Sequence, residues 1–232
     1  MSTPWGALDD RAWRLYAGVH RLLIRLAGRL PDEVVTRART MLAAGDLAYL
    51  PDMLTLAAAE NGVSLTAGDL DLLRDVLAAL GLDGEPAGAA AVPPQDGTEA
   101  PGYAFSPDSV RPPRIPPGLD LSSGVPPESA DLEDDLFDLT DHLVVDALSE
   151  RAGVVTVRRA WRATLDGSGA PHRVYLAEVD PGVAAWELTA EAQTEMDQMD
   201  EPDPQVEVYW TGDDLPPYHR AALTAAVLLW HR

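Results

Sequence analysis

The chain has no cysteine and no lysine among its 232 residues, and all 17 of its basic residues are arginine. Without cysteine it cannot form disulfides, thiolate nucleophiles, cysteine-ligated zinc sites or iron–sulfur clusters, and it needs no oxidising compartment. Without lysine it cannot use a Schiff base, a P-loop lysine or a lysine general base. High alanine and arginine content without lysine is also typical of a high-GC bacterial genome.

Long hydrophobic runs and targeting signals are lacking as well. The longest apolar stretch, residues 221–230, is interrupted by Thr224 and is about half of the roughly 20 residues needed to cross a bilayer. The start, MSTPWGALDDRAW, has two aspartates before the first apolar run and no small-residue cleavage pattern. We therefore expect a cytoplasmic protein without a membrane-spanning segment.

Positive charge is scarce, and the net charge of −21 is unevenly distributed. Residues 1–82 carry a net −2, residues 83–130 carry −5 and residues 131–232 carry −14. Such a field disfavours nucleic acid, whose phosphates need arginine or lysine for neutralisation. It favours a basic protein partner, although acidity that serves only solubility stays an alternative.

A proline-rich segment divides the chain. Residues 83–130 contain 11 of the 20 prolines and six glycines, too many for a core of their own. We predict a helical domain at 1–82, a Pro/Gly-rich linker at 83–130 and an acidic α+β domain at 131–232. Because Tyr103 and Phe105 are apolar, a free spacer and a strap docked on a domain both stay open. The single PxxP at Pro113 and Pro116 is a weak recognition motif.

Leucine and alanine spacing predicts about four helices in the N-terminal part. One apolar stripe begins at Leu8 and repeats every three or four residues to Leu30. Thr66 and Asp69 have the spacing of a capping box at the start of the fourth helix. We therefore expect an all-helical bundle here.

The C-terminal part changes from helical to strand periodicity. A helical stripe from Leu132 to Leu148 precedes two alternating strands joined by the turn Asp166–Gly169. A third strand is expected over Val183–Leu188, a fourth over Val206–Trp210, and a last helix extending to Trp230. The predicted fold class is α+β, with a mainly antiparallel sheet of about four strands flanked by two helices.

No catalytic or metal-binding fingerprint emerges. The five histidines, His20, His142, His172, His219 and His231, are scattered without metal-ligand spacing. The acidic residues lack the alternating ligands and central glycine of an EF-hand loop, and Ser168 belongs to a hairpin turn rather than a nucleophile elbow. We expect no catalytic residue, no metal and no cofactor.

The leading hypothesis is a non-enzymatic module whose acidic C-terminal domain engages a basic protein, of the immunity-factor or regulatory-subunit type. The residues predicted to bind this partner are Asp134, Asp135, Asp138, Asp141, Trp186, Glu191, Glu195 and Tyr209. One alternative is a small hydrolase that uses His142 or His219 with neighbouring carboxylates, which requires a histidine beside a carboxylate at the base of a pocket. The other is a membrane-surface adaptor that uses the basic first helix, whose burial against the other helices would remove it from that role.

Overall fold

The computed structural model of the chain describes residues 8–82, 84–93, 102–108, 128–198 and 203–232, and for residues 128–138 it describes the helical backbone alone. Helices and strands are mixed along the chain, which confirms the α+β class. In chain order they are α1 (Asp10–Leu26), α2 (Asp32–Ala44), α3 (Leu50–Glu60), α4 (Ala67–Ala79), a short 3-10 helix η1 (Ala89–Ala91), β1 (Tyr103–Ser106), α5 (Glu128–Ser149), β2 (Val154–Thr164), β3 (His172–Val179), α6 (Ala185–Asp197), β4 (Gln205–Trp210), α7 (Pro217–Ala225) and β5 (Val227–His231).

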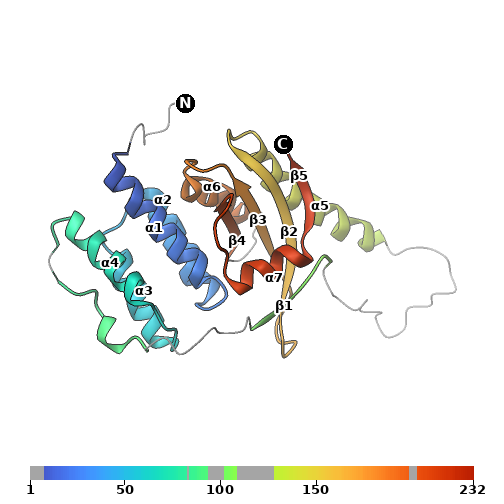
Figure 1. Cartoon of the computed structure of the whole chain (residues 1–232). Helices are drawn as coiled ribbons and strands as arrows, with labels where there is room; N and C mark the ends of the chain where they lie inside the picture. The colour runs from blue at the N-terminus through green and yellow to red at the C-terminus, as the bar shows by residue number, and fades with distance from the viewer. Residues whose placement is uncertain (1–7, 83, 94–101, 109–127, 199–202) are drawn as a thin grey trace.

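A five-stranded sheet lies at the centre of the molecule (Figure 1). Its longest strand, β2, pairs antiparallel with β3 on one side. On the other side β1 pairs with the second half of β2 and β5 with the first half, both antiparallel. β4 lies outside β3 and runs parallel to it, because α6 returns the chain across one face of the sheet. The sheet is therefore mainly antiparallel, as predicted, but it has five strands rather than about four, and three helices rather than two flank it in the C-terminal part.

Helices cover both faces of this sheet. α5 and α6 lie on one face, where alternate strand residues such as Val157, Tyr175 and Val208 belong to the larger core cluster. α7 crosses the opposite face (Figure 1), where Val174 and Leu176 pack in a smaller cluster with residues of α7. The alternation of buried residues along each strand thus serves two separate cores.

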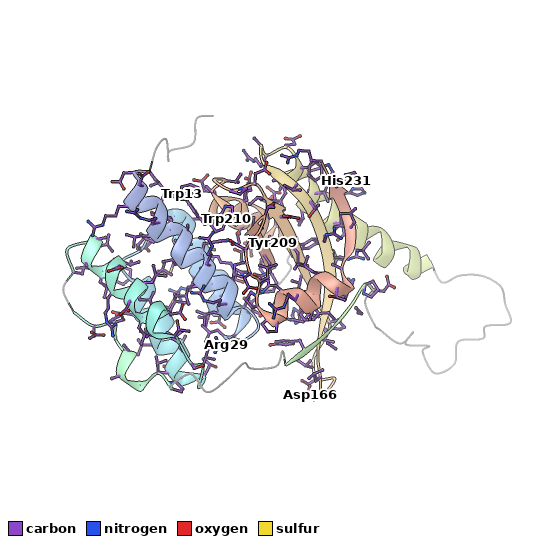
Figure 2. All side chains as sticks on the ribbon, viewed as in Figure 1. Trp13, Arg29, Asp166, Tyr209, Trp210 and His231 are labelled. Carbon is purple, nitrogen blue, oxygen red and sulfur yellow. The ribbon has the colours of Figure 1, made fainter. Side chains whose placement is uncertain are left out.

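The four N-terminal helices lie beside the sheet, with α1 and α2 nearest to it (Figure 1). α1 packs against α2 and α4 on one side and against α6 and β4 on the other. The predicted capping box at the start of α4 is confirmed, because the Asp69 amide donates to the Thr66 hydroxyl at 3.0 Å and the Thr66 amide donates to the Asp69 carboxylate at 3.0 Å. Trp13 and Trp210, labelled in Figure 2, lie where α1 meets the sheet.

The helices α1 and α2 close the outer edge of the sheet at β4. The His20 ring donates through Nε2 to the carbonyl oxygen of Val208 at 2.7 Å. The hydroxyl of Thr36 donates to the carbonyl oxygen of Pro204 at 3.2 Å. Side chains of α1 and α2 therefore donate hydrogen bonds to backbone carbonyls at this edge that would otherwise bond to water. One buried cluster runs without interruption from α1 and α2 into α6 and β4.

Part of the proline-rich segment is docked. Tyr103 and Phe105 lie in β1, and the Phe105 ring meets that of Tyr218 edge-on at 5.1 Å. For residues 103–106 the docked strap is the correct alternative. Pro113 and Pro116, which form the PxxP motif, lie outside the described residues.

Two predictions about secondary structure are wrong. The strand expected over Val183–Leu188 is the start of α6. Over the whole of α6 the buried residues are spaced three or four apart, and the six residues of the expected strand are too few to show this helical spacing. The last helix does not extend to Trp230; α7 ends at Ala225, and the chain becomes β5 because β2 offers it an unpaired edge. β-branched and large apolar side chains suit that position.

Candidate protein-binding surface

The strongest concentration of charge lies in the first half of α5. Seven of the fourteen residues at 128–141 are acidic and none is basic. Three of the predicted partner-binding residues, Asp134, Asp135 and Asp138, lie on this stretch of helical backbone. Their side chains are outside the description, so their role in binding stays a prediction.

Asp141, the last acid of this group, is held inside the protein. Its carboxylate accepts a hydrogen bond from the Tyr175 hydroxyl at 2.6 Å and forms an ion pair with Arg159. Burial, followed by the charge of Asp141, raises the pKa of Tyr175. Because the carboxylate already has two internal partners, Asp141 anchors α5 to β2 and β3 and offers little charge to an outside partner.

A second acidic row runs along α6. Glu187, Glu191 and Glu195 are four residues apart and therefore share one helical face, where each is partly exposed. Arg151 forms an ion pair with Glu191. Burial and the neighbouring charge of Glu191 raise the pKa of Glu187. The row therefore keeps unbalanced negative charge, and Glu191 and Glu195 stay predicted partner-binding residues.

The two aromatic residues among the predicted partner-binding residues are buried. Trp186 is 1% exposed and its ring meets that of Trp13 edge-on at 4.8 Å. Tyr209 is 7% exposed and packs in the small cluster on the other face of the sheet, and burial raises its pKa to about 12. The two rings lie in separate cores, so the prediction that they contribute to a partner-binding surface is wrong for this structure. The sequence could not show that α1 covers Trp186.

A charged cluster that the sequence did not reveal lies in the interior. The side chains of Arg39 on α2, Glu207 on β4 and His219 on α7 are at most 1% exposed. Glu207 forms an ion pair with Arg39 and accepts a hydrogen bond from Nε2 of His219 at 2.9 Å. Burial raises the pKa of Glu207, but Arg39 and His219 outweigh it and hold the pKa at about 2.

This cluster bears on the hydrolase alternative. His219 is within hydrogen-bond reach of a carboxylate, but it is fully buried and does not line the pockets at the end of α1, between α1 and α4, or beside the β2–β3 turn. His142 is exposed on α5. Neither histidine therefore stands at the base of a pocket that a substrate can enter.

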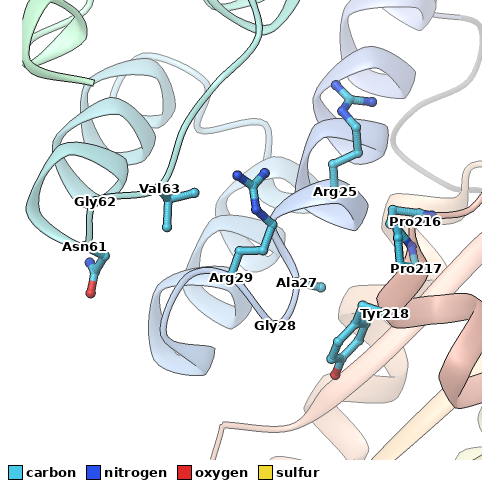
Figure 3. Close-up of a pocket in the computed structure, with 10 residues that line it drawn as sticks. All are labelled: Arg25, Ala27, Gly28, Arg29, Asn61, Gly62, Val63, Pro216, Pro217 and Tyr218. Atoms are coloured by element: carbon cyan, nitrogen blue, oxygen red, sulfur yellow. The ribbon is translucent and has the colours of Figure 1, made fainter. Parts of the chain in front are cut away.

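The pocket in Figure 3, of about 250 Å³, lies between the end of α1, the connection from α3 to α4 and the start of α7. Two arginines line it, and both are engaged in the structure. Arg25 forms an ion pair with Asp69, and Arg29 donates to the carbonyl oxygen of Ser64 at 2.9 Å. These contacts tie α1 to the start of α4, so we assign the arginines a structural role.

The apolar face of the basic first helix is buried. This burial removes the helix from the membrane-binding role that was one alternative. Its apolar stripe packs into the larger core, and Arg21 pairs with Asp213 at 3.0 Å. In the part of the chain that the structure describes, no helix is long and apolar enough to cross a membrane. The same residues contain no group of three or more His, Asp or Glu side chains that could hold a metal ion.

The search against known proteins gave no relative. No protein-family model, no curated protein and no solved structure matches the chain. The function is therefore inferred from the residues and their arrangement alone.

Proposed function

We propose that the protein is a non-enzymatic cytosolic binding module whose acidic C-terminal part engages a basic protein, in the manner of an immunity factor or a regulatory subunit. The observation that carries the proposal is the first half of α5, with seven acidic residues and no basic one in fourteen positions.

The helix by itself gives little reason for so much charge. Acids favour the positive end of the helix dipole only within the first turn. Beyond it, carboxylates three and four residues apart, such as Asp134 with Asp138, destabilise an isolated helix by about 0.2–0.5 kcal/mol per pair. A basic partner would remove this repulsion and gain from the same charge. Charge complementarity would mainly accelerate association and discourage wrong partners.

Some acids of the C-terminal part are already paired within the chain. Glu207 and Asp213 of the C-terminal part form ion pairs with Arg39 and Arg21 of the N-terminal part. Two arginines of the N-terminal helices are thus paired with acids of the C-terminal part. On α6, Glu191 pairs with Arg151, while Glu187 and Glu195 are partly exposed, which supports assigning this row to an outside partner.

We further propose that residues 1–82 form a four-helix bundle and residues 131–232 an acidic domain, joined by the segment 83–130. The shared core then acts as the interface between the two units. In an acidic unit that is covered on one side by helices, the α6 row stays partly exposed.

The test is co-purification of the full chain from its native cell at low salt, with mass spectrometry of what accompanies it. A triple variant, Asp134→Asn with Asp135→Asn and Asp138→Asn, should lose the partner. The matched control is Asp46→Asn with Glu60→Gln and Asp75→Asn, which removes three exposed acids from the N-terminal helices and should retain it. Equal recovery by both variants, or no stoichiometric partner for the native chain, would contradict the proposal.

A further inference from the structure

The two outer edges of the sheet, at β4 and at β5, differ in what covers their backbone groups. At β4 the helices α1 and α2 cover the edge, and His20 hydrogen-bonds the Val208 carbonyl. At β5 no described strand pairs on the side away from β2. In an antiparallel pair about every second residue directs its N–H and C=O away from the partner. β5 therefore presents backbone donors and acceptors that can pair with an added strand.

The sequence of β5 does little to discourage such pairing. Residues 227–230 read VLLW and contain no proline and no charge, although proteins usually protect edge strands with these residues. Val227 is 38% exposed and Leu228 is 43% exposed. Shortness is the one protective feature that β5 has. Among the described residues, β5 thus lacks the cover that α1 and α2 give to the edge at β4.

The helix α5 provides a floor beside this open edge. It packs against β2 and β5, and its first half continues past β5 and away from the sheet (Figure 1). A strand added next to β5 would lie over this projecting half. The sequence places Leu132, Leu136 and Leu139 there at helical spacing, and Leu139 is 43% exposed. An added strand would therefore lie beside a helical segment whose sequence is rich in leucine and in acids.

The edge of β2 that β5 occupies also holds a strand from a distant part of the chain. β1, which comes from the proline-rich segment, pairs with Trp161–Thr164 of β2, directly beyond the part that β5 occupies. Tyr103 and Phe105 fix it against Tyr218. This sheet thus already holds one extended segment by main-chain pairing and a few aromatic contacts, which is the mode of binding proposed for β5.

We propose that an extended segment of a basic protein adds to the sheet as a strand beside β5, where its arginines or lysines are attracted to the acidic first half of α5. This rests on the proposed function and specifies its partner as a strand of alternating basic and apolar residues. Charge selects this occupant over a second copy of the chain, because a copy would bring the same acidic helix and repel the first.

The probe is a short synthetic peptide that alternates arginine with valine, labelled for fluorescence anisotropy and titrated with the full chain. A control peptide keeps every arginine and replaces alternate valines with proline, which removes backbone donors without changing the charge. We expect the control to bind at least about tenfold more weakly, a difference of about 1.4 kcal/mol. Hydrogen exchange should show protection of the β5 amides with the first peptide only.

Leu228→Asp separates backbone pairing from charge, because it adds negative charge while it spoils the apolar edge. Strand addition predicts weaker binding of the arginine–valine peptide, whereas pure electrostatics predicts equal or stronger binding. Leu80→Asp, at a residue of similar exposure at the end of α4, is the matched control and should bind like the native chain. Thermal denaturation of both variants shows whether each is folded.

The outcomes distinguish the two proposals. Equal binding of both peptides without protection of β5 would overturn strand addition and leave the acidic surface as the binding site. No binding of either peptide at low salt would contradict the proposed function itself. A dimer of the free chain with protected β5 amides would show that a second copy occupies the edge, and would overturn the inference.

Discussion

At the scale of single residues, the central feature is the buried cluster of Arg39, Glu207 and His219. Its members come from α2, β4 and α7, so it joins the N-terminal helices to the strand and to the helix on the far side. Nε and Nη1 of Arg39 and Oε1 of Glu207 have no hydrogen-bond partner among the described residues. Burying charge without complete pairing is costly. We therefore expect the cluster to specify how α2, β4 and α7 pack together rather than to add to the free energy of unfolding.

The first prediction follows from this cost. Glu207→Leu leaves the guanidinium of Arg39 buried without its counter-charge and should lower the free energy of unfolding by about 3–5 kcal/mol. The double variant Arg39→Met with Glu207→Leu removes both charges, so we expect it to recover most of that loss. Urea denaturation of the two single variants and the double variant measures the coupling. Additive losses in the double variant would show that the pair does not act as a unit.

The second prediction concerns His20 and pH. Burial lowers the pKa of His20 from 6.5 to about 4, so below pH 6.5 the unfolded chain takes up a proton that the folded chain refuses. Stability should therefore fall by up to about 3 kcal/mol as the pH drops from about 6.5 to about 4. Glu207, whose pKa is lowered from 4.5 to about 2, contributes its own loss only below about pH 4.5.

His20→Gln provides the comparison for this prediction. The amide of glutamine is able to donate to the Val208 carbonyl but does not titrate. Denaturation at pH 6.5 and pH 4.5 should show a smaller loss of stability for the variant than for the native chain. Equal losses would assign the pH dependence to other groups.

At the scale of elements, packing between distant segments decided several outcomes that local patterns left open. The capping box of α4 and the β2–β3 hairpin depend on residues close in sequence, and both were predicted. The identity of α6 and β5 was not, because Ala185–Leu188 and Val227–Trp230 are short apolar stretches that suit either structure. Contact with α1 and with β2 selects between them.

The third prediction tests the turn between α1 and α2. Gly28 has φ +72°, and a Cβ there would clash with the ring of Tyr218. Gly62 has φ +65° with nothing within 4 Å of its added Cβ. Both Gly→Ala changes incur the left-handed backbone cost of about 1–2 kcal/mol. Gly28→Ala should lose a further 1–3 kcal/mol or so from overpacking against α7.

Thermal or urea denaturation of the two variants measures this difference. Near-UV circular dichroism should also change more for Gly28→Ala, because Tyr218 is displaced from its contact with Arg162. Equal destabilisation by both substitutions would indicate that the end of α1 does not press against α7 in solution.

At the scale of the whole molecule, the two parts on either side of the proline-rich segment share one core and exchange ion pairs. Arg21 and Arg39 pair with acids of the C-terminal part, and Arg162 of β2 pairs in the other direction with Asp32. The apolar face of the basic, amphipathic helix α1 is covered by β4 and α6, so it needs no membrane surface to cover it. The linker therefore connects parts that are in contact.

The fourth prediction is the behaviour of the chain after limited proteolysis. Cleavage should occur first between residues 83 and 130, outside the paired residues 103–106. Because α1 and α2 share a core with α6 and β4, the products should elute together in size-exclusion chromatography and separate only in denaturant. Early cleavage within residues 131–232, or separation of the products in native buffer, would contradict this arrangement.

The sequence by itself determined the α+β class, the helices of the first 82 residues, the hairpin, the position of β4 and the acidic character of α5. These depend on local periodicity, capping and turn residues, whose physical causes act within a few positions. Only the tertiary structure decided that Trp186 and Tyr209 are buried, that Arg39 meets Glu207 and His219, and that helices cover the sheet edge at β4 while no described strand pairs with the outer side of β5. Those outcomes depend on which distant surfaces meet, and the pairing of such surfaces leaves no periodic signal in the chain.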